Sequence, residues 1–142
     1  MRRAVLFLLL PLAVACGRAA PPEPFFGNWR VTSVSTPGVS ALSPQTAQGA
    51  VGTAAAFSGR RASYGDDRCS GPSYTRRWLS RTTFSEAYGI DPAQLSLSGQ
   101  QIEFVDVTCE SGALNQADTL IIRDDATMLT PRDGAFYVLT RQ

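Results

Sequence analysis

The sequence predicts a mainly β protein, a small antiparallel β-barrel of about eight strands with two short helices. Two observations predict this fold class. Apolar and polar residues alternate over many short segments, as they do in strands with one buried face. Turn residues separate these segments at regular spacing, and the dipeptide Asp133-Gly134 is a strong signal for a hairpin turn. A β-sandwich or a barrel of another type fits the same pattern.

The predicted strands follow from this alternation between turn residues. The clearest strand has apolar residues on both faces, with Ile102 and Phe104 on one and Val105 and Val107 on the other. The segments expected to form strands are residues 27–35, 53–57, 61–64, 73–79, 101–109, 117–123, 127–130 and 135–141.

Two short helices are expected from their capping residues. The first begins at Ser43-Pro44, an N-cap followed by proline at the first helical position, and ends before Gly52. The second begins with a capping box at Thr83 and ends before Gly89. The helical side chains expected to face the core are Ala47, Ala50, Val51, Phe84, Ala87 and Tyr88.

The beginning of the chain predicts a signal peptide. Arg2 and Arg3 give it a positive start, and an uncharged run follows over residues 4–14. Such a run is too short to span a bilayer as a helix, which takes about 20 residues. The run ends in Ala-Val-Ala-Cys, and this motif resembles the lipobox of bacterial lipoproteins, in which the cysteine, here Cys16, is acylated after cleavage.

The lipoprotein resemblance implies a domain organisation and a location. Residues 1–15 are the signal peptide, residues 16–25 hold the lipid-bearing cysteine and a Pro-rich tether, and residues 26–142 form the β-barrel-like domain. The partner is then a membrane. Gly17 stands where an inner-membrane retention signal has Asp, which implies the outer membrane, with the domain facing the periplasm. The same motif also suits an ordinary signal peptidase, which would leave a secreted protein with a free Cys16.

The cysteine count bears on the domain itself, because the chain has three cysteines. If Cys16 carries lipid, Cys69 and Cys109 remain as a pair in an oxidising compartment, where disulfides persist. A bridge between them closes a loop of about 40 residues and contributes about 4 kcal/mol of stability. The alternative is a pair of buried free thiols.

The charged residues exclude several classes of function. The basic residues are all Arg, and the chain has no His, so Ser-His-Asp and Cys-His catalytic arrangements are absent. No cysteine spacing suits zinc, and the Asp66-Asp67 and Asp124-Asp125 pairs lack the alternating ligands of a calcium loop. No basic excess supports nucleic-acid binding. We therefore expect a protein that is not an enzyme and has no cofactor, metal site, catalytic residue or nucleic-acid partner.

Gly27-Asn28-Trp29 and the late Arg141 carry a second resemblance. They are similar to the Gly-x-Trp motif of the lipocalin and calycin barrels and to the Arg that packs across that Trp. The resemblance implies a calycin-like barrel in which Trp29 plugs one end. The Arg141 guanidinium would stack on its ring and donate to nearby carbonyls. From the residues alone, Trp29 is also explained as a core aromatic of another β protein.

Tyr74, Arg76 and Trp78 are the candidate binding residues, because they share one face of a predicted strand. An aromatic–Arg–aromatic stripe suits an anionic or sugar ligand, through stacking and bidentate hydrogen bonds. It also suits a protein partner, since Trp, Tyr and Arg are enriched at binding hot spots. The structural explanation is a barrel wall in which Arg76 stacks between the two rings.

Three functions are open at this point. The preferred one is an envelope-anchored, calycin-like module that binds a small apolar or amphipathic ligand, which requires space inside the barrel. The second is an inhibitor or protein-interaction module of the cell envelope, with a packed interior and a protruding loop. The Gly-, Asp- and Pro-containing segment 65–72 is the candidate for that loop. The third is a structural lipoprotein without a ligand.

Overall fold

The computed structural model describes residues 22–142, so the predicted signal peptide, Cys16 and most of the tether lie outside the described residues. Three short helical segments interrupt the strands: α1 (Pro44–Gln48), α2 (Arg81–Tyr88) and a 3-10 turn, η1 (Pro92–Leu95), which the sequence did not predict. The strands are β1 (Gly27–Ser35), β2 (Ala54–Phe57), β3 (Arg61–Tyr64), β4 (Asp67–Ser80), β5 (Gln101–Ala113), β6 (Thr119–Asp124), β7 (Thr127–Arg132) and β8 (Ala135–Arg141).

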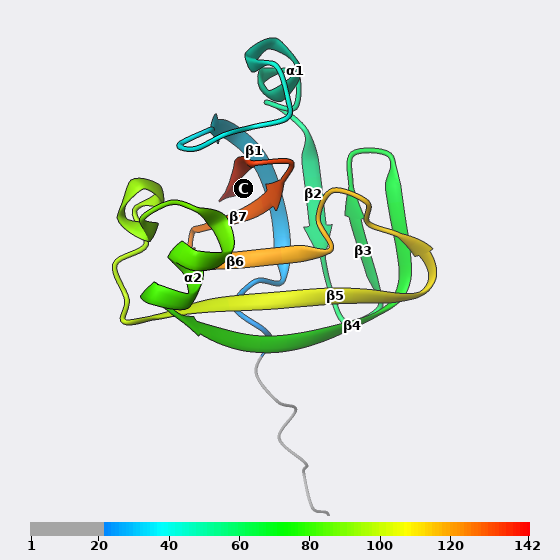
Figure 1. Cartoon of the computed structure of the whole chain (residues 1–142). Helices are drawn as coiled ribbons and strands as arrows, with labels where there is room; N and C mark the ends of the chain where they lie inside the picture. The colour runs from blue at the N-terminus through cyan, green and yellow to red at the C-terminus, as the bar shows by residue number, and fades with distance from the viewer. Residues whose placement is uncertain (1–21) are drawn as a thin grey trace, which may run out of the picture.

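The eight strands form a closed antiparallel barrel in which each strand pairs with its sequence neighbours and β8 pairs with β1 (Figure 1). The predicted fold class, mainly β with about eight strands and two short helices, is therefore confirmed. Closure pairs Trp29 with Arg141 and Val31 with Leu139. No helix within residues 22–142 has the length and apolar content needed to cross a membrane.

The barrel has two apolar layers, one inside it and one on its outer wall. Val105 and Val107 belong to the interior cluster. Ile102 and Phe104, on the other face of β5, belong to an outer cluster together with Phe84 of α2. Both faces of β5 are therefore covered, which explains its apolar pattern. In Figure 1, α2 and the chain that follows it lie against one side of the barrel.

The two ends of the barrel are built differently. At one end, which we call the closed end, the N-terminal segment 22–26 meets the turn between β2 and β3 and the end of β8. At the opposite end, which we call the mouth, lie α1, the β3–β4 turn, the segment 114–118 and the β7–β8 turn. Figure 1 shows α1 at one end and the N-terminus of the described chain at the other.

Segment 65–72 is the main error of the sequence prediction. It was expected to be an exposed loop, but β4 starts at Asp67 and only a tight turn separates it from β3. Cys69 pairs with Ala62 of β3 on one side and with Gly112 of β5 on the other. Pairing on both sides keeps this stretch extended, although its Gly and Pro residues favour a loop. Segment 65–72 is therefore a tight turn followed by a strand, and not the protruding loop that was expected for an inhibitor.

The helix predictions hold in part. Ser80, not Thr83, is the N-cap of α2, since its hydroxyl accepts a hydrogen bond from the Thr83 N–H at 3.1 Å. Gly89 ends α2 as predicted, with φ of 69°. Ala87 faces solvent because Phe84 and Tyr88, four residues apart, form the inner face. The helix α1 ends at Gln48, so Val51 lies beyond it and is 43% exposed.

Candidate functional site

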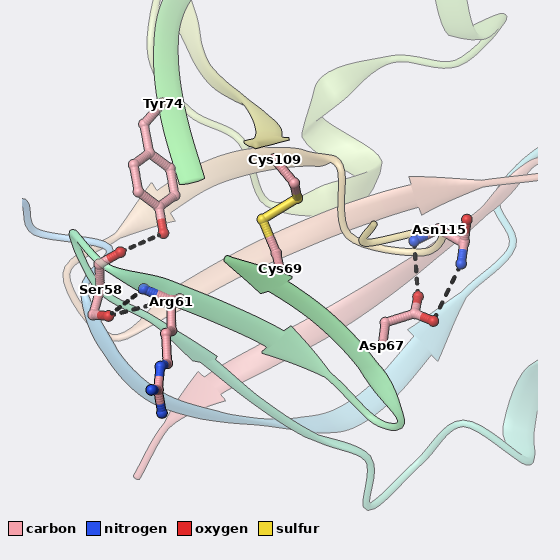
Figure 2. The surroundings of a disulfide bond; sticks show 7 residues. All are labelled: Ser58, Arg61, Asp67, Cys69, Tyr74, Cys109 and Asn115. Carbon is pink, nitrogen blue, oxygen red and sulfur yellow. Dashed lines mark hydrogen bonds between the residues drawn. A yellow bond between two sulfur atoms is a disulfide. The ribbon is translucent and has the colours of Figure 1, made fainter. Parts of the chain in front are cut away.

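A disulfide joins Cys69 of β4 to Cys109 of β5, which confirms the predicted bridge (Figure 2). The two Cα atoms lie 5.4 Å apart, and the Cys69 side chain is buried. The two cysteines are not opposite each other in the ladder between these strands: Cys69 pairs with Gly112, whereas Cys109 pairs with Pro72. The bridge therefore crosses the β4–β5 ribbon diagonally and links its two strands covalently.

The closed end is filled by Trp29 and Arg141. The Arg141 guanidinium carbon lies 4.3 Å from the centroid of the Trp29 ring, a cation–π distance. The guanidinium also donates hydrogen bonds to the carbonyls of Phe26 at 2.8 Å and Asp125 at 2.9 Å, and to that of Pro24. Trp29 is buried, and its indole N–H donates to the carbonyl of Phe25 at 3.0 Å.

The candidate stripe Tyr74, Arg76 and Trp78 is divided by the N-terminal segment. The Tyr74 ring packs on Phe25 and Phe26, and its hydroxyl donates to the Ser58 carbonyl at 2.8 Å (Figure 2). Arg76 forms ion pairs with Glu23 and with Glu103, the latter at 2.9 Å. Only Trp78 is largely exposed, at 54%. The N-terminal segment therefore contacts two of the three side chains, Tyr74 and Arg76.

Large side chains fill the interior of the barrel. Trp29, Phe57, Met128 and Leu139 are buried members of one continuous cluster. A ligand chamber along the barrel axis would need smaller residues at these positions. Hollows that open to solvent lie elsewhere, at the mouth and on the outer wall. This packing moves the candidate ligand site from the barrel axis to the mouth.

The mouth has a hollow of about 430 Å³ between α1, the β3–β4 turn and the ends of β7 and β8. Its wall combines apolar groups on the α1 side with hydroxyl, amide and guanidinium groups on the barrel side, and Asp66 and Asp67 of the β3–β4 turn also line it. The side chains that matter most for the chemistry are Leu42, Ala50, Tyr64, Gln116, Arg132 and Tyr137.

Tyr64 is the most informative residue of the mouth. Its side chain is 3% exposed, and its hydroxyl is buried without a hydrogen-bond partner in the described residues. Burial raises the pKa of Tyr64 to about 12; Tyr137 adds to this rise and Arg132 opposes it. Burial also raises the pKa of Tyr137. Both phenols are therefore hydrogen-bond donors over the physiological pH range.

The rim of the mouth is held by hydrogen bonds from the segment 114–118. The Asn115 backbone N–H and its side-chain amide donate to the Asp67 carboxylate at 2.7 and 3.2 Å (Figure 2). Arg132 donates to the Asn115 carbonyl and lies 3.3 Å from the Asp133 carboxylate. Thr130 donates to the Gln116 carbonyl at 2.7 Å. These contacts tie β4 and β7 to one segment, so the protein's own hydrogen bonds hold the rim.

The mouth residues were not found by sequence reasoning. Alternation in 61–64 does predict that Tyr64 faces inward, but it gives no reason to pair it with Tyr137 or Arg132, far away in the chain. Within residues 22–142, no three His, Cys, Asp or Glu side chains are grouped as a metal site would need. No protein-family model matches this chain, and the searches of curated proteins and of solved structures match it to no relative.

Proposed function

We propose that the protein is a lipid-anchored module of the bacterial cell envelope that binds a small amphipathic anion at the mouth of its barrel, without enzymatic activity. The observation that carries this proposal is the buried Tyr64 hydroxyl, which has no hydrogen-bond partner within residues 22–142. A buried donor left without a partner costs about 1–3 kcal/mol. A ligand oxygen at this position would remove that cost.

The surroundings of Tyr64 favour an anionic head group. Its raised pKa keeps the phenol protonated, so the hydroxyl is available to donate a hydrogen bond to a ligand acceptor. Tyr137 and Arg132 add a second phenol and a guanidinium to the same hollow. Arg132 forms an ion pair with Asp133, but the carboxylate of Asp133 is half exposed. The guanidinium is therefore still available to a ligand. A carboxylate satisfies all three donors.

The opposite side of the hollow favours a short apolar tail. Leu42 and Ala50 are partly buried and pack against the interior cluster, and both line the hollow. The volume of about 430 Å³ lies in the range of small-molecule sites, about 300–1,000 Å³. Because the interior below is filled, a long chain has no room to continue along the barrel axis. The ligand is therefore a carboxylate of moderate length.

The anchor and the mouth lie at opposite ends in this account. The described chain starts at Pro22 at the closed end, next to the tether that leads back to Cys16. A Pro-rich tether extends by about 3.1 Å per residue. If Cys16 carries lipid, the closed end faces the membrane and the mouth opens into the periplasm. The Gly-x-Trp geometry supports a calycin-like description of the barrel.

Calorimetric titration of the full chain with octanoate tests the ligand proposal. We expect saturable binding that Tyr64→Phe weakens by about tenfold, because one charge-assisted hydrogen bond contributes about 1.5 kcal/mol. Tyr88→Phe is the matched control, since Tyr88 packs against Phe104 on the outer wall. Equal affinity of the wild type and Tyr64→Phe, or no binding of octanoate at all, would contradict the proposal.

Intact mass spectrometry of the membrane-extracted protein tests the anchor separately. A mature chain that begins at an acylated Cys16 is the expected result. An unmodified Cys16, or a chain cut elsewhere, would refute the anchor and leave the ligand proposal standing, because the mouth is formed only by residues of the barrel domain.

A further inference from the structure

The arginines of the described residues fall into separate groups. Of the ten in residues 22–142, five form ion pairs with Asp or Glu, and Arg141 stacks on Trp29. The other four have no carboxylate of the described residues within ion-pair distance, and all four lie on β1 to β4 or the turn between β2 and β3. These are Arg30, Arg60, Arg61 and Arg68.

Two of these arginines form a regular arrangement with two serines on the outer wall. Arg61 pairs with Ser70, and Ser63 pairs with Arg68, on neighbouring strands β3 and β4. The residues between them, such as Ala62 and Cys69, belong to the interior cluster, so these four side chains point outward. The backbone positions of the two arginines thus occupy one diagonal of a square, about 7–8 Å across, and those of the two serines occupy the other.

An open hollow lies over this square. It has a volume of about 900 Å³ and is lined by both arginines, by Ser58, Ser63 and Ser70, and by Asn28 of β1. Ala56 pairs with Ser63 and with Asn28, and its small side chain leaves room between the polar groups. This hollow lies on the wall of the barrel rather than at its mouth.

Both guanidiniums are available for an anion. The Arg61 side chain extends away from the disulfide and makes none of the interactions drawn in Figure 2. One nitrogen of Arg68 donates to the carbonyls of Gly65 and Asp67 at 2.6 and 2.8 Å, which positions the group and leaves its other donors open. The Asp67 carboxylate is already engaged by Asn115.

Another carboxylate near the square is that of Glu110 on β5. It lies against Gly71, where an added Cβ would meet it, and forms no ion pair with any of the four arginines. Guanidiniums that face hydroxyls and no carboxylate form a site for a tetrahedral oxyanion, since Arg matches phosphate with parallel N–H donors.

We propose that this arginine–serine square binds a phosphate group. Arg61 and Arg68 each donate two hydrogen bonds to phosphate oxygens, and Ser63 and Ser70 donate from the other diagonal. The phosphate comes either from a soluble phosphate ester or from an anionic lipid head group. The site is separate from the mouth and does not depend on the proposed ligand there.

Titration of the isotope-labelled full chain in a neutral detergent tests this, with inorganic pyrophosphate as the soluble probe and phosphatidylglycerol mixed into the micelles as the lipid probe. We expect amide shifts confined to residues 61–63 and 68–70 with at least one probe, and the responding probe identifies the source. The double variant Arg61→Gln/Arg68→Gln should weaken the response about tenfold or more.

Arg123→Gln is the matched control for loss of charge, because Arg123 lies on β6 and its guanidinium is 3.7 Å from Asp124. A response that survives in the double variant, or that Arg123→Gln reduces equally, would overturn the proposal. If neither probe causes amide shifts, the proposal is also overturned. Unchanged amide dispersion outside the square shows that each variant is folded.

Discussion

The Arg141 guanidinium lies over the ring of Trp29, 4.3 Å from its centroid, although one residue is in the first strand and the other at the end of the last. Their backbones pair directly where β8 closes onto β1. The contact therefore joins the two ends of the domain. Gly27 makes it possible, since a Cβ there would lie 2.7 Å from a guanidinium nitrogen of Arg141.

Gly27→Ala should destabilise the barrel. Gly27 has φ of 134°, which side-chain-bearing residues rarely adopt, and the added methyl group would displace Arg141 from Trp29. We expect a loss of about 2 kcal/mol in the free energy of unfolding, measured by urea denaturation. Gly59→Ala is the control, because a Cβ there meets only Phe26 at 3.9 Å. If the two variants are equally stable, Gly27 has no such role.

Removing the disulfide should lower the free energy of unfolding more than Gly27→Ala does. The double variant Cys69→Ala/Cys109→Ala opens a loop that spans 40 residues, and the chain-entropy relation gives a loss of about 4 kcal/mol. Denaturant unfolding of this variant and of the wild type, the latter with and without a reductant, measures the loss. A wild type that is as stable reduced as oxidised would show that the bridge is dispensable.

Alkaline pH should unfold the protein through its buried phenols. The pKa of Tyr64 is raised to about 12 in the folded state, against 10.0 for an ordinary tyrosine. The unfolded chain therefore releases this proton first, so the stabilisation is complete below pH 10 and is lost as the pH rises towards 12. The loss from Tyr64 is about 3 kcal/mol at most.

Urea midpoints measured across this pH range test that prediction. Tyr64→Phe should flatten the dependence, and Tyr74→Phe should do so as well, since burial also raises the pKa of Tyr74 to about 12. A dependence that is as steep in both variants as in the wild type would assign the alkaline unfolding to other groups.

Tyr64→Phe should also stabilise the unliganded protein at neutral pH. The substitution removes a hydroxyl that is buried without a partner, and a gain of about 1 kcal/mol is expected. Thermal unfolding without ligand measures it. A gain in stability coupled to a loss of octanoate affinity is the behaviour of a binding residue. A loss of stability would instead mean that the hydroxyl has a structural partner.

Much of the fold could be predicted from the sequence because the signals are local. The bounds of β1 and β8 follow from alternation, and the Asp133-Gly134 turn follows from residues that accept positive φ, here 52° and 81°. Segment 65–72 could not be predicted, because its two neighbouring strands, and not its own residues, make it a strand.

The candidate sites depend on information that is not local. Tyr64 and Tyr137 meet only because the barrel closes, and Arg61 and Arg68 share a square only because of the register between β3 and β4. The stripe of Tyr74 and Arg76 was visible in the sequence. What covers it, the segment around Glu23 and Phe25, was not visible, because docking of a Pro-rich tether leaves no periodic pattern.

The measurement that tests the central claim most directly uses the four tyrosines of the chain. Tyr64 and Tyr137 lie at the mouth, Tyr74 at the closed end and Tyr88 on the outer wall. With tyrosine-labelled protein, intermolecular NOEs from octanoate should reach the rings of Tyr64 and Tyr137 alone. NOEs to Tyr74 or Tyr88 in place of these, or to none of the four, would contradict the assignment of the mouth as the ligand site.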